Sequence, residues 1–170
     1  GSWAGPVVAG AVILDDDNLM PPLRSELDDS KKLTARKRQM LFEMLPTCAS
    51  IGVGIADVNE IDRLNILEAS FLAMARAISD LPQKPGYVIV DGNRLPDLPY
   101  PGEYVVKGDS RSLSIAAASI VAKVTRDNIM VNLAKTSTGY GWERNAGYGT
   151  QEHKIALERL GVTEHHRKSY

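Results

Sequence analysis

The chain has 170 residues, of which 44% are hydrophobic and 24% charged, and its net charge at pH 7 is -1. These values are typical of one globular domain with its own core, so we expect a single domain over residues 1–170. The nearly balanced charge excludes a general attraction for nucleic acid, so any polyanion must be held by local basic patches. The one cysteine excludes an internal disulfide and a cysteine-based zinc site, and it fits a reducing, cytoplasmic compartment. No apolar run approaches the roughly 20 residues that cross a membrane.

Strands and helices alternate along the chain. Short apolar runs predict strands over Pro6–Leu14, Ile51–Val58, Tyr87–Val90 and Val105–Lys107. Apolar residues at helical spacing predict helices from Ala35 to about Leu45 with Thr34 as cap, from Asn59 to about Asp80, from Ser110 to about Lys135, and from Gln151 to Leu160. We expect Pro21–Lys32 to be a loop and the two early strands to pair as antiparallel neighbours. The alternation predicts an α/β fold.

Acidic residues follow two of the predicted strands. The Tyr87–Val90 run is apolar on both faces, which predicts a buried and parallel strand with Asp91 at its carboxyl end. Asp109 follows the Val105–Lys107 run in the same way. Ligands of open α/β sheets bind at this edge, and two acids there favour a hard cation such as Mg²⁺. A turn or helix-cap role explains both acids equally well at this stage.

Two carboxylates are too few for a site with two metal ions, which usually needs a third or a fourth. Asp57 and Asp127 are candidate supplements, although each also fits a capping or surface position. Lys107, two residues before Asp109, is placed to steady the acids or to contact a phosphate. Two Mg²⁺ ions together can activate a water and stabilise the leaving oxygen of a phosphodiester.

Other residues favour contact with nucleic acid. Lys31 and Lys32 belong to the densest basic cluster of the chain. An ordinary solvated helix face is the alternative explanation of this cluster. Tyr148 lies between two glycines and can present its ring to a sugar or base, or it can anchor the loop on the core. The tail is basic; its paired histidines, His165 and His166, are expected to be solvated. No phosphate-binding loop or dinucleotide-binding motif supports a small-molecule enzyme.

Taken in order, segments over nearly the whole chain resemble type 2 ribonuclease H, the bacterial ribonuclease HII. Each segment alone is a weak signal, but the ordered set is highly specific. The matching segments are Ala4–Val8, Asp29–Leu33, Gly52–Gly54, Ile61–Ala77, Val90–Asn93, Lys107–Asp109, Ser114–Ile120, Ala122–Asp127, Gly147–Thr150 and His166–Ser169.

The resemblance implies a ribonuclease H-like α/β/α sandwich with a mixed central sheet. It implies a monomeric endonuclease that uses two Mg²⁺ or Mn²⁺ ions to cut RNA in RNA–DNA hybrids. It also implies incision 5′ to single ribonucleotides in duplex DNA, leaving a 3′-hydroxyl and a 5′-phosphate, as in ribonucleotide excision repair. By resemblance, the catalytic and metal-binding acids include Asp91 and Asp109, and Tyr148 senses the ribose–deoxyribose junction. The resemblance also implies that Lys31, Lys32, Arg167 and Lys168 face the nucleic-acid backbone, and Lys107 joins these substrate-binding candidates through its position beside Asp109.

One departure from the family is large. The family opens with a strand ending in Asp-Glu-x-Gly-Arg-Gly directly before the segment that begins at Ala4, and only Gly1 corresponds to it here. That motif supplies the other two carboxylates and the loop that reads the 2′-hydroxyl. Three accounts fit: the given sequence omits residues of the protein, a second piece completes it, or the chain is truncated and inactive. We favour the first, because losing the central strand would leave strand edges unpaired. The alternative function is a non-catalytic nucleic-acid-binding module or an inactive fragment.

Overall fold

A computed structural model describes residues 1–169, which form two compact units. Unit 1 contains residues 1–7, 56–70 and those from 125 onward, and unit 2 contains residues 8–55 and 71–124. No helix among residues 1–169 is long and apolar enough to cross a lipid bilayer. The helices are α1 (Pro21–Glu26), α2 (Ala35–Met44), α3 (Val58–Leu64), α4 (Ile66–Ser79), α5 (Leu113–Thr136), α6 (Trp142–Asn145) and α7 (Gln151–Leu160).

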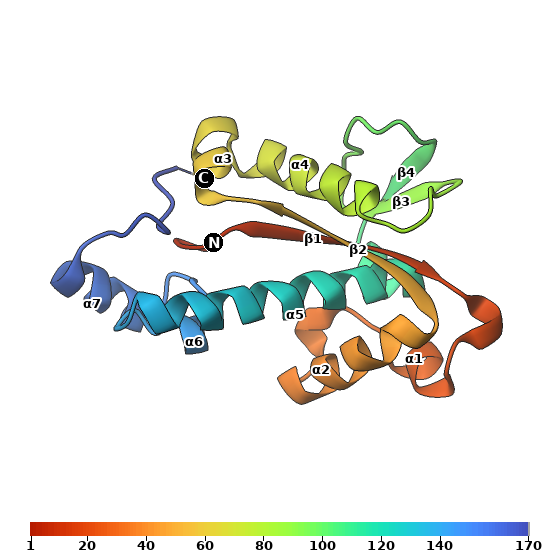
Figure 1. Cartoon of the computed structure of the whole chain (residues 1–170), viewed down its shortest axis with the longest axis horizontal. Coiled ribbons are helices and arrows are strands. Elements are labelled where there is room, and N and C mark those ends of the chain that lie inside the picture. The colour runs from red at the N-terminus through yellow and green to blue at the C-terminus, as the bar shows by residue number, and fades with distance from the viewer. Residues whose placement is uncertain (170) are drawn as a thin grey trace. The chain divides into compact units, whose positions relative to one another are not determined.

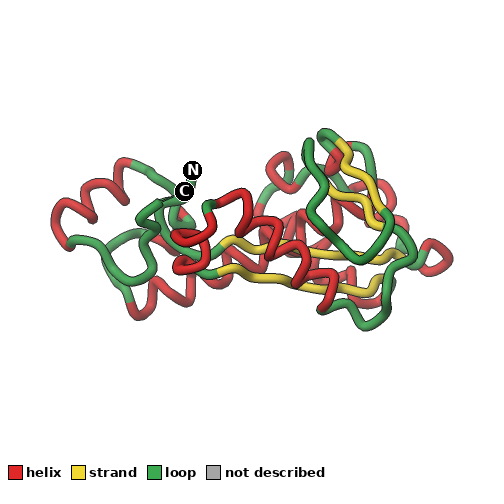
Figure 2. The backbone as a smooth tube through the Cα atoms, turned by 90° about the horizontal axis from the view of Figure 1, so that it is seen from above, coloured by secondary structure: helices red, strands yellow, loops and turns green. Residues whose placement is uncertain are grey.

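The strands of unit 2 form two separate pairs, which Figure 2 shows in yellow. β1 (Val7–Leu14) pairs with β2 (Ala49–Ala56), and the two run in opposite directions in Figure 1. β3 (Val88–Asp91) pairs in parallel with β4 (Gly102–Val105), with Asp91 opposite Val105. The antiparallel early pair and the parallel strand that ends in Asp91 are therefore as predicted.

Helices pack closely on both faces of the first strand pair, because glycines in the strands leave room for them. A Cβ on Gly54 of β2 would lie 1.9 Å from the carbonyl oxygen of Ala73 in α4. A Cβ on Gly10 of β1 would lie 2.4 Å from the carbonyl oxygen of Ala118 in α5. The parts of α4 and α5 that belong to unit 2 lie on opposite faces of this pair (Figure 1). The result is the expected order of helix, sheet and helix.

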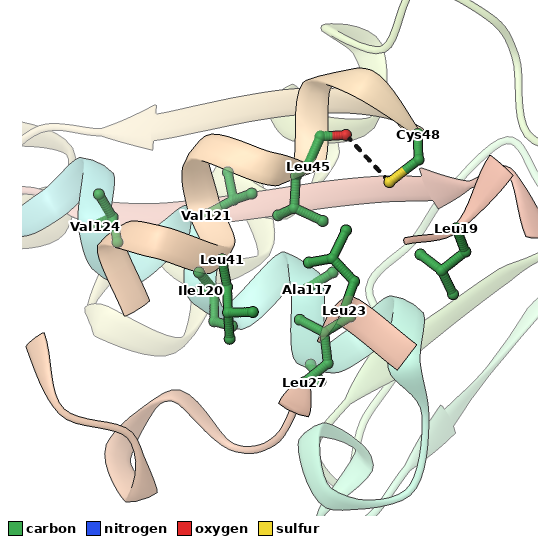
Figure 3. Packing of buried hydrophobic residues seen from close by; sticks show 11 residues of the cluster. Leu19, Leu23, Leu27, Leu41, Leu45, Cys48, Ala117, Ile120, Val121 and Val124 are labelled. Carbon is green, nitrogen blue, oxygen red and sulfur yellow. Dashed lines mark hydrogen bonds between the residues drawn. The ribbon is translucent and has the colours of Figure 1, made fainter. Parts of the chain in front are cut away.

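The main core of unit 2 is apolar and draws on helices α1, α2 and α5 (Figure 3). Leucines from α1 and α2 meet the small-residue face of α5, where alanines allow close approach. The Cys48 thiol lies in this core, with Sγ 3.7 Å from the carbonyl oxygen of Leu45. The buried residues are Leu19, Leu23, Leu27, Leu41, Leu45, Cys48, Ala116, Ala117, Ile120, Val121 and Val124.

Several predicted boundaries are wrong. The expected helix from Asn59 to Asp80 is two helices, because Asn65 adopts a left-handed backbone with φ of 75°. The first of them, α3, begins at Val58, and Asp57 caps it in a capping box with Glu60.

Two other local predictions also fail. The expected loop over Pro21–Lys32 contains α1, because a proline suits the first position of a helix as well as it suits a loop. The expected strand over Val105–Lys107 lies earlier, at Gly102–Val105, and Asp109 sits in the 3₁₀ turn Gly108–Ser110.

Unit 1 has an aromatic core that includes two histidines. The Tyr140 and Trp142 rings stack with centroids 5.1 Å apart, and the imidazoles of His153 and His166 are buried beside them. His166 is only 4% exposed, so the prediction of a solvated tail histidine is wrong for this residue. Burial, and then the neighbouring His153 and His165, lower the pKa of His166 to about 4.

This lowered pKa predicts an acid-sensitive fold. Between its folded pKa of about 4 and its unfolded pKa of 6.5, His166 binds a proton in the unfolded chain but not in the folded one. The free energy of unfolding should therefore fall as the pH drops from about 6.5 to about 4, by up to about 3 kcal/mol from this group. Urea titrations between pH 7 and pH 4 of the wild type and of His166→Gln measure this component. The stability difference between the two proteins should shrink as the pH falls; parallel curves would contradict the assignment.

Candidate active site

Asp91 fastens the turn that carries the second predicted acid. It is the last residue of β3, and its Oδ1 accepts a hydrogen bond of 2.8 Å from the backbone N–H of Gly108. Lys107 makes the preceding bend in a left-handed conformation, with φ of 54°. Gly108 is buried, and a Cβ there would lie 2.6 Å from the side chain of Ile115. This contact brings Asp109 next to Asp91 although the strand before Asp109 ends at Val105.

Asp109 lies in a field of negative charge. Burial raises its pKa, and the charges of Asp91 and Asp29 and a side-chain hydrogen bond with Asp29 raise it further. The positive charge of Lys31 acts in the opposite direction. The structure thus places Asp109 close to Asp91, Asp29 and Lys31. Sequence reasoning missed Asp29, although it opens one of the family segments.

The acid pair fits part of a divalent metal site. Carboxylate oxygens are the ligands that Mg²⁺ and Mn²⁺ prefer. Burial raises the pKa of Asp109, and the negative charges of Asp91 and Asp29 raise it further. A cation would relieve this repulsion. Within residues 1–169 no group of three or more His, Cys, Asp or Glu side chains is arranged to hold an ion. Of the two candidate supplements, Asp57 caps α3 and Asp127 lies on α5, both in unit 1.

The three lysines of unit 2 that were predicted to bind substrate differ in their surroundings. Lys32 is paired with Asp28, with Nζ 3.3 Å from Oδ1 and both side chains partly exposed. Lys107 is exposed at the bend before Asp109. Lys31 is exposed, and its backbone N–H donates to Oδ1 of Asp29 at 3.0 Å. Of these three lysines, Lys31 acts on the charge of Asp109, and Lys107 directly precedes the turn that contains it.

Unit 1 holds Tyr148 with its ring partly exposed. The side chain is 46% exposed, and the guanidinium of Arg126 lies 5.6 Å from the ring centroid. Arg126 also donates to three backbone carbonyls, those of Pro6 at 3.0 Å, Ala146 at 2.7 Å and Ala4 at 3.0 Å. The Tyr148 ring therefore lies next to the Arg126 guanidinium, which hydrogen-bonds to the N-terminal segment.

The two basic tail residues have different surroundings. Arg167 donates to the carbonyls of Gly5 at 3.0 Å and Pro6 at 3.2 Å, and burial followed by the charge of Arg126 lowers its pKa to about 10. Lys168 is exposed, and its backbone N–H donates to Asp62. Arg167 thus has a structural task within unit 1 that the sequence did not reveal.

A family model described as Ribonuclease HII matches residues 1–170. The chain belongs to the ribonuclease HII family. The ribonuclease HII of Rhodospirillum rubrum is 58% identical over 172 residues, covering 100% of this chain and 79% of that protein. The ribonuclease HII of Paramagnetospirillum magneticum is 58% identical over 170 residues, covering 100% and 85%.

Solved structures agree with the family. The ribonuclease H2 of Pyrococcus horikoshii matches with a TM-score of 0.79 and 27% identity, covering 100% of this chain and 89% of that one. The ribonuclease HII of Archaeoglobus fulgidus, solved in complex with PCNA, shares the fold with a TM-score of 0.77 at 22% identity, covering 100% and 90%. These matches confirm the predicted ribonuclease H-like fold.

Membership of the ribonuclease HII family also decides the class of reaction. The chain is an endoribonuclease that acts on RNA–DNA hybrids, and the family depends on divalent metal ions. The alternative of a non-catalytic nucleic-acid-binding module is not favoured.

Proposed function

We propose that this ribonuclease HII incises duplex DNA 5′ to single ribonucleotides, as well as cutting longer hybrids, with Asp91 and Asp109 as catalytic carboxylates. The observation that carries the proposal is the hydrogen bond from Gly108 to Asp91, because it fixes the turn of Asp109 at the end of β3. The two carboxylates would supply part of the ligand set for Mg²⁺ or Mn²⁺. When bound, two such ions lower the pKa of an attacking water and stabilise charge on the leaving oxygen.

The chain's own residues orient the acids and the substrate. The Gly108 N–H holds the Asp91 carboxylate in place, and Asp29 adds negative charge beside Asp109. Lys31 and Lys107 supply positive charge near the acids, where a phosphodiester has to approach.

Residues farther from the acids contact the rest of the substrate. Tyr148 stacks its ring on the sugar at the ribose–deoxyribose junction. Lys32, Arg167 and Lys168 contribute charge towards the nucleic-acid backbone; for Arg167 this comes in addition to its bonds to Gly5 and Pro6. We further propose that the enzyme acts as a monomer in the cytoplasm.

The test is an incision assay on matched duplexes with the full-length protein. One duplex contains a single ribonucleotide in DNA, a second is a full RNA–DNA hybrid, and a third is DNA alone. With Mg²⁺ or Mn²⁺ the first two should be cut and the third left intact, and a chelator should stop both reactions. Cutting of the hybrid alone would refute the single-ribonucleotide activity, while cutting of the all-DNA duplex would refute recognition of ribose.

A further inference from the structure

A continuous chain of hydrogen bonds leads from the C-terminal segment to Tyr148. The backbone N–H of Thr163 donates to Nδ1 of His166 at 2.9 Å. Nε2 of His166 lies 3.0 Å from Nε2 of His153, and Nδ1 of His153 lies 3.0 Å from the carbonyl oxygen of Tyr148. All of these groups belong to unit 1, and His153 is fully buried on α7.

Only one arrangement of protons satisfies this chain. A backbone N–H can only donate, so Nδ1 of His166 must be the acceptor, and the neutral ring carries its proton on Nε2. That proton points to His153, whose Nε2 also accepts from the indole N–H of Trp142 at 3.3 Å. Nε2 of His153 is therefore unprotonated, and its proton sits on Nδ1. There it donates to the Tyr148 carbonyl, which can only accept.

The same loop is fixed at the residues around Tyr148. The Tyr148 N–H donates to the carbonyl of Asn145 at 2.9 Å, and the Gly147 N–H donates to Oδ1 of Asn145 at 2.9 Å. The N–H of Trp3 donates to the Gly147 carbonyl at 2.8 Å. The backbone of Tyr148 is thus held on both sides by hydrogen bonds.

We propose that His153 and His166 are positioning residues for Tyr148, acting as a neutral hydrogen-bonded pair with fixed tautomers. The proposal deepens the proposed function and rests on the role given there to Tyr148. The pair touches no substrate; it sets where the tyrosine ring stands. Buried donors and acceptors that are all satisfied give a single rigid arrangement, whereas a partly satisfied network would let the loop move.

Two variants of His166 separate positioning from mere packing. In His166→Gln the amide nitrogen takes the place of Nε2 and keeps the donor to His153. In His166→Asn the shorter amide reaches only the Thr163 side, and the donor is lost. The two side chains are both uncharged amides that differ by one methylene. The control is His165→Asn at the neighbouring position, because no hydrogen bond of the His165 ring joins the pair in the described residues.

Nuclear magnetic resonance tests the pair without any substrate. Long-range proton–nitrogen spectra at pH 7 should show His153 protonated on Nδ1 and His166 on Nε2. The Tyr148 amide signal should shift in His166→Asn and stay close to wild type in His166→Gln. A proton on Nε2 of His153, or an unshifted Tyr148 amide in His166→Asn, would overturn the proposal.

Kinetics test the consequence on the duplex with one ribonucleotide. His166→Asn should lower kcat/KM by about 5- to 20-fold, and the loss should vanish when Tyr148→Ala is already present, because coupled residues are not additive. His166→Gln and His165→Asn should stay within about 2-fold of wild type. Equal losses in both backgrounds would overturn positioning through Tyr148. If Tyr148→Ala itself cleaves normally, the role of Tyr148 in the proposed function fails, and the spectra still decide the pair.

Discussion

Asp91→Asn is expected to reduce cleavage of a ribonucleotide-containing duplex by more than about 100-fold. The amide keeps the size of the side chain and can still accept from Gly108, so the turn of Asp109 should survive. It removes the negative charge that a divalent ion requires. Removing a group that hydrogen-bonds to a metal ligand already lowers metal affinity or activity by about 10- to 100-fold. Removing the charge of a ligand itself should therefore lower activity further. Single-turnover rates at saturating Mn²⁺ measure the effect.

The matched control for this prediction is Asp97→Asn, which neutralises an exposed acid on the loop after β3. Its cleavage rate should equal that of the wild type. Asp91→Asn should also keep the wild-type unfolding midpoint to within a small shift. Equal rates for Asp91→Asn and Asp97→Asn would remove Asp91 from the active site.

Arg126→Met is expected to lower the free energy of unfolding by about 3 kcal/mol. The substitution preserves much of the apolar stem but leaves the carbonyls of Ala4 and Ala146 without their charged donor, while the Pro6 carbonyl keeps its bond from Arg167. Each buried acceptor that loses its partner costs roughly 1–3 kcal/mol, partly offset where water can enter. It also removes the cation beneath the Tyr148 ring. Urea titration at pH 7 measures the change.

Arg144→Met provides the comparison for Arg126→Met. Arg144 pairs with Glu143 and Glu152, but its side chain is 64% exposed, so water replaces those contacts. Exposed ion pairs contribute about 0–1 kcal/mol, and the unfolding midpoint should barely move. If the two variants lose equal stability, the hydrogen bonds from Arg126 to the N-terminal segment stabilise the fold no more than an exposed ion pair does.

The sequence predicts those elements whose signals are local. Thr34 caps α2 as expected, and α7 ends at Leu160 as expected, followed by Gly161 with φ of 78°. The β3 strand and the acid at its end also follow from a short apolar run bounded by turn residues. In each case the determining residues lie within a few positions of one another.

The sequence does not predict contacts between distant segments. Asp29 reaches Asp109 across 80 positions, and Arg126 reaches Ala4 across 122, so no periodicity or motif reports either contact. The burial of His166 likewise depends on packing against the Tyr140 and Trp142 rings. Composition of the tail suggests solvent exposure, because basic neighbours surround that histidine in the sequence.

The most direct measurement is the position and chemistry of the cut in a DNA duplex that contains one ribonucleotide. We expect a single metal-dependent incision on the 5′ side of the ribonucleotide, leaving a 3′-hydroxyl and a 5′-phosphate, and we expect its loss in Asp91→Asn. An intact duplex under the same conditions with the full-length wild-type protein, or a cut on the 3′ side, would contradict this expectation.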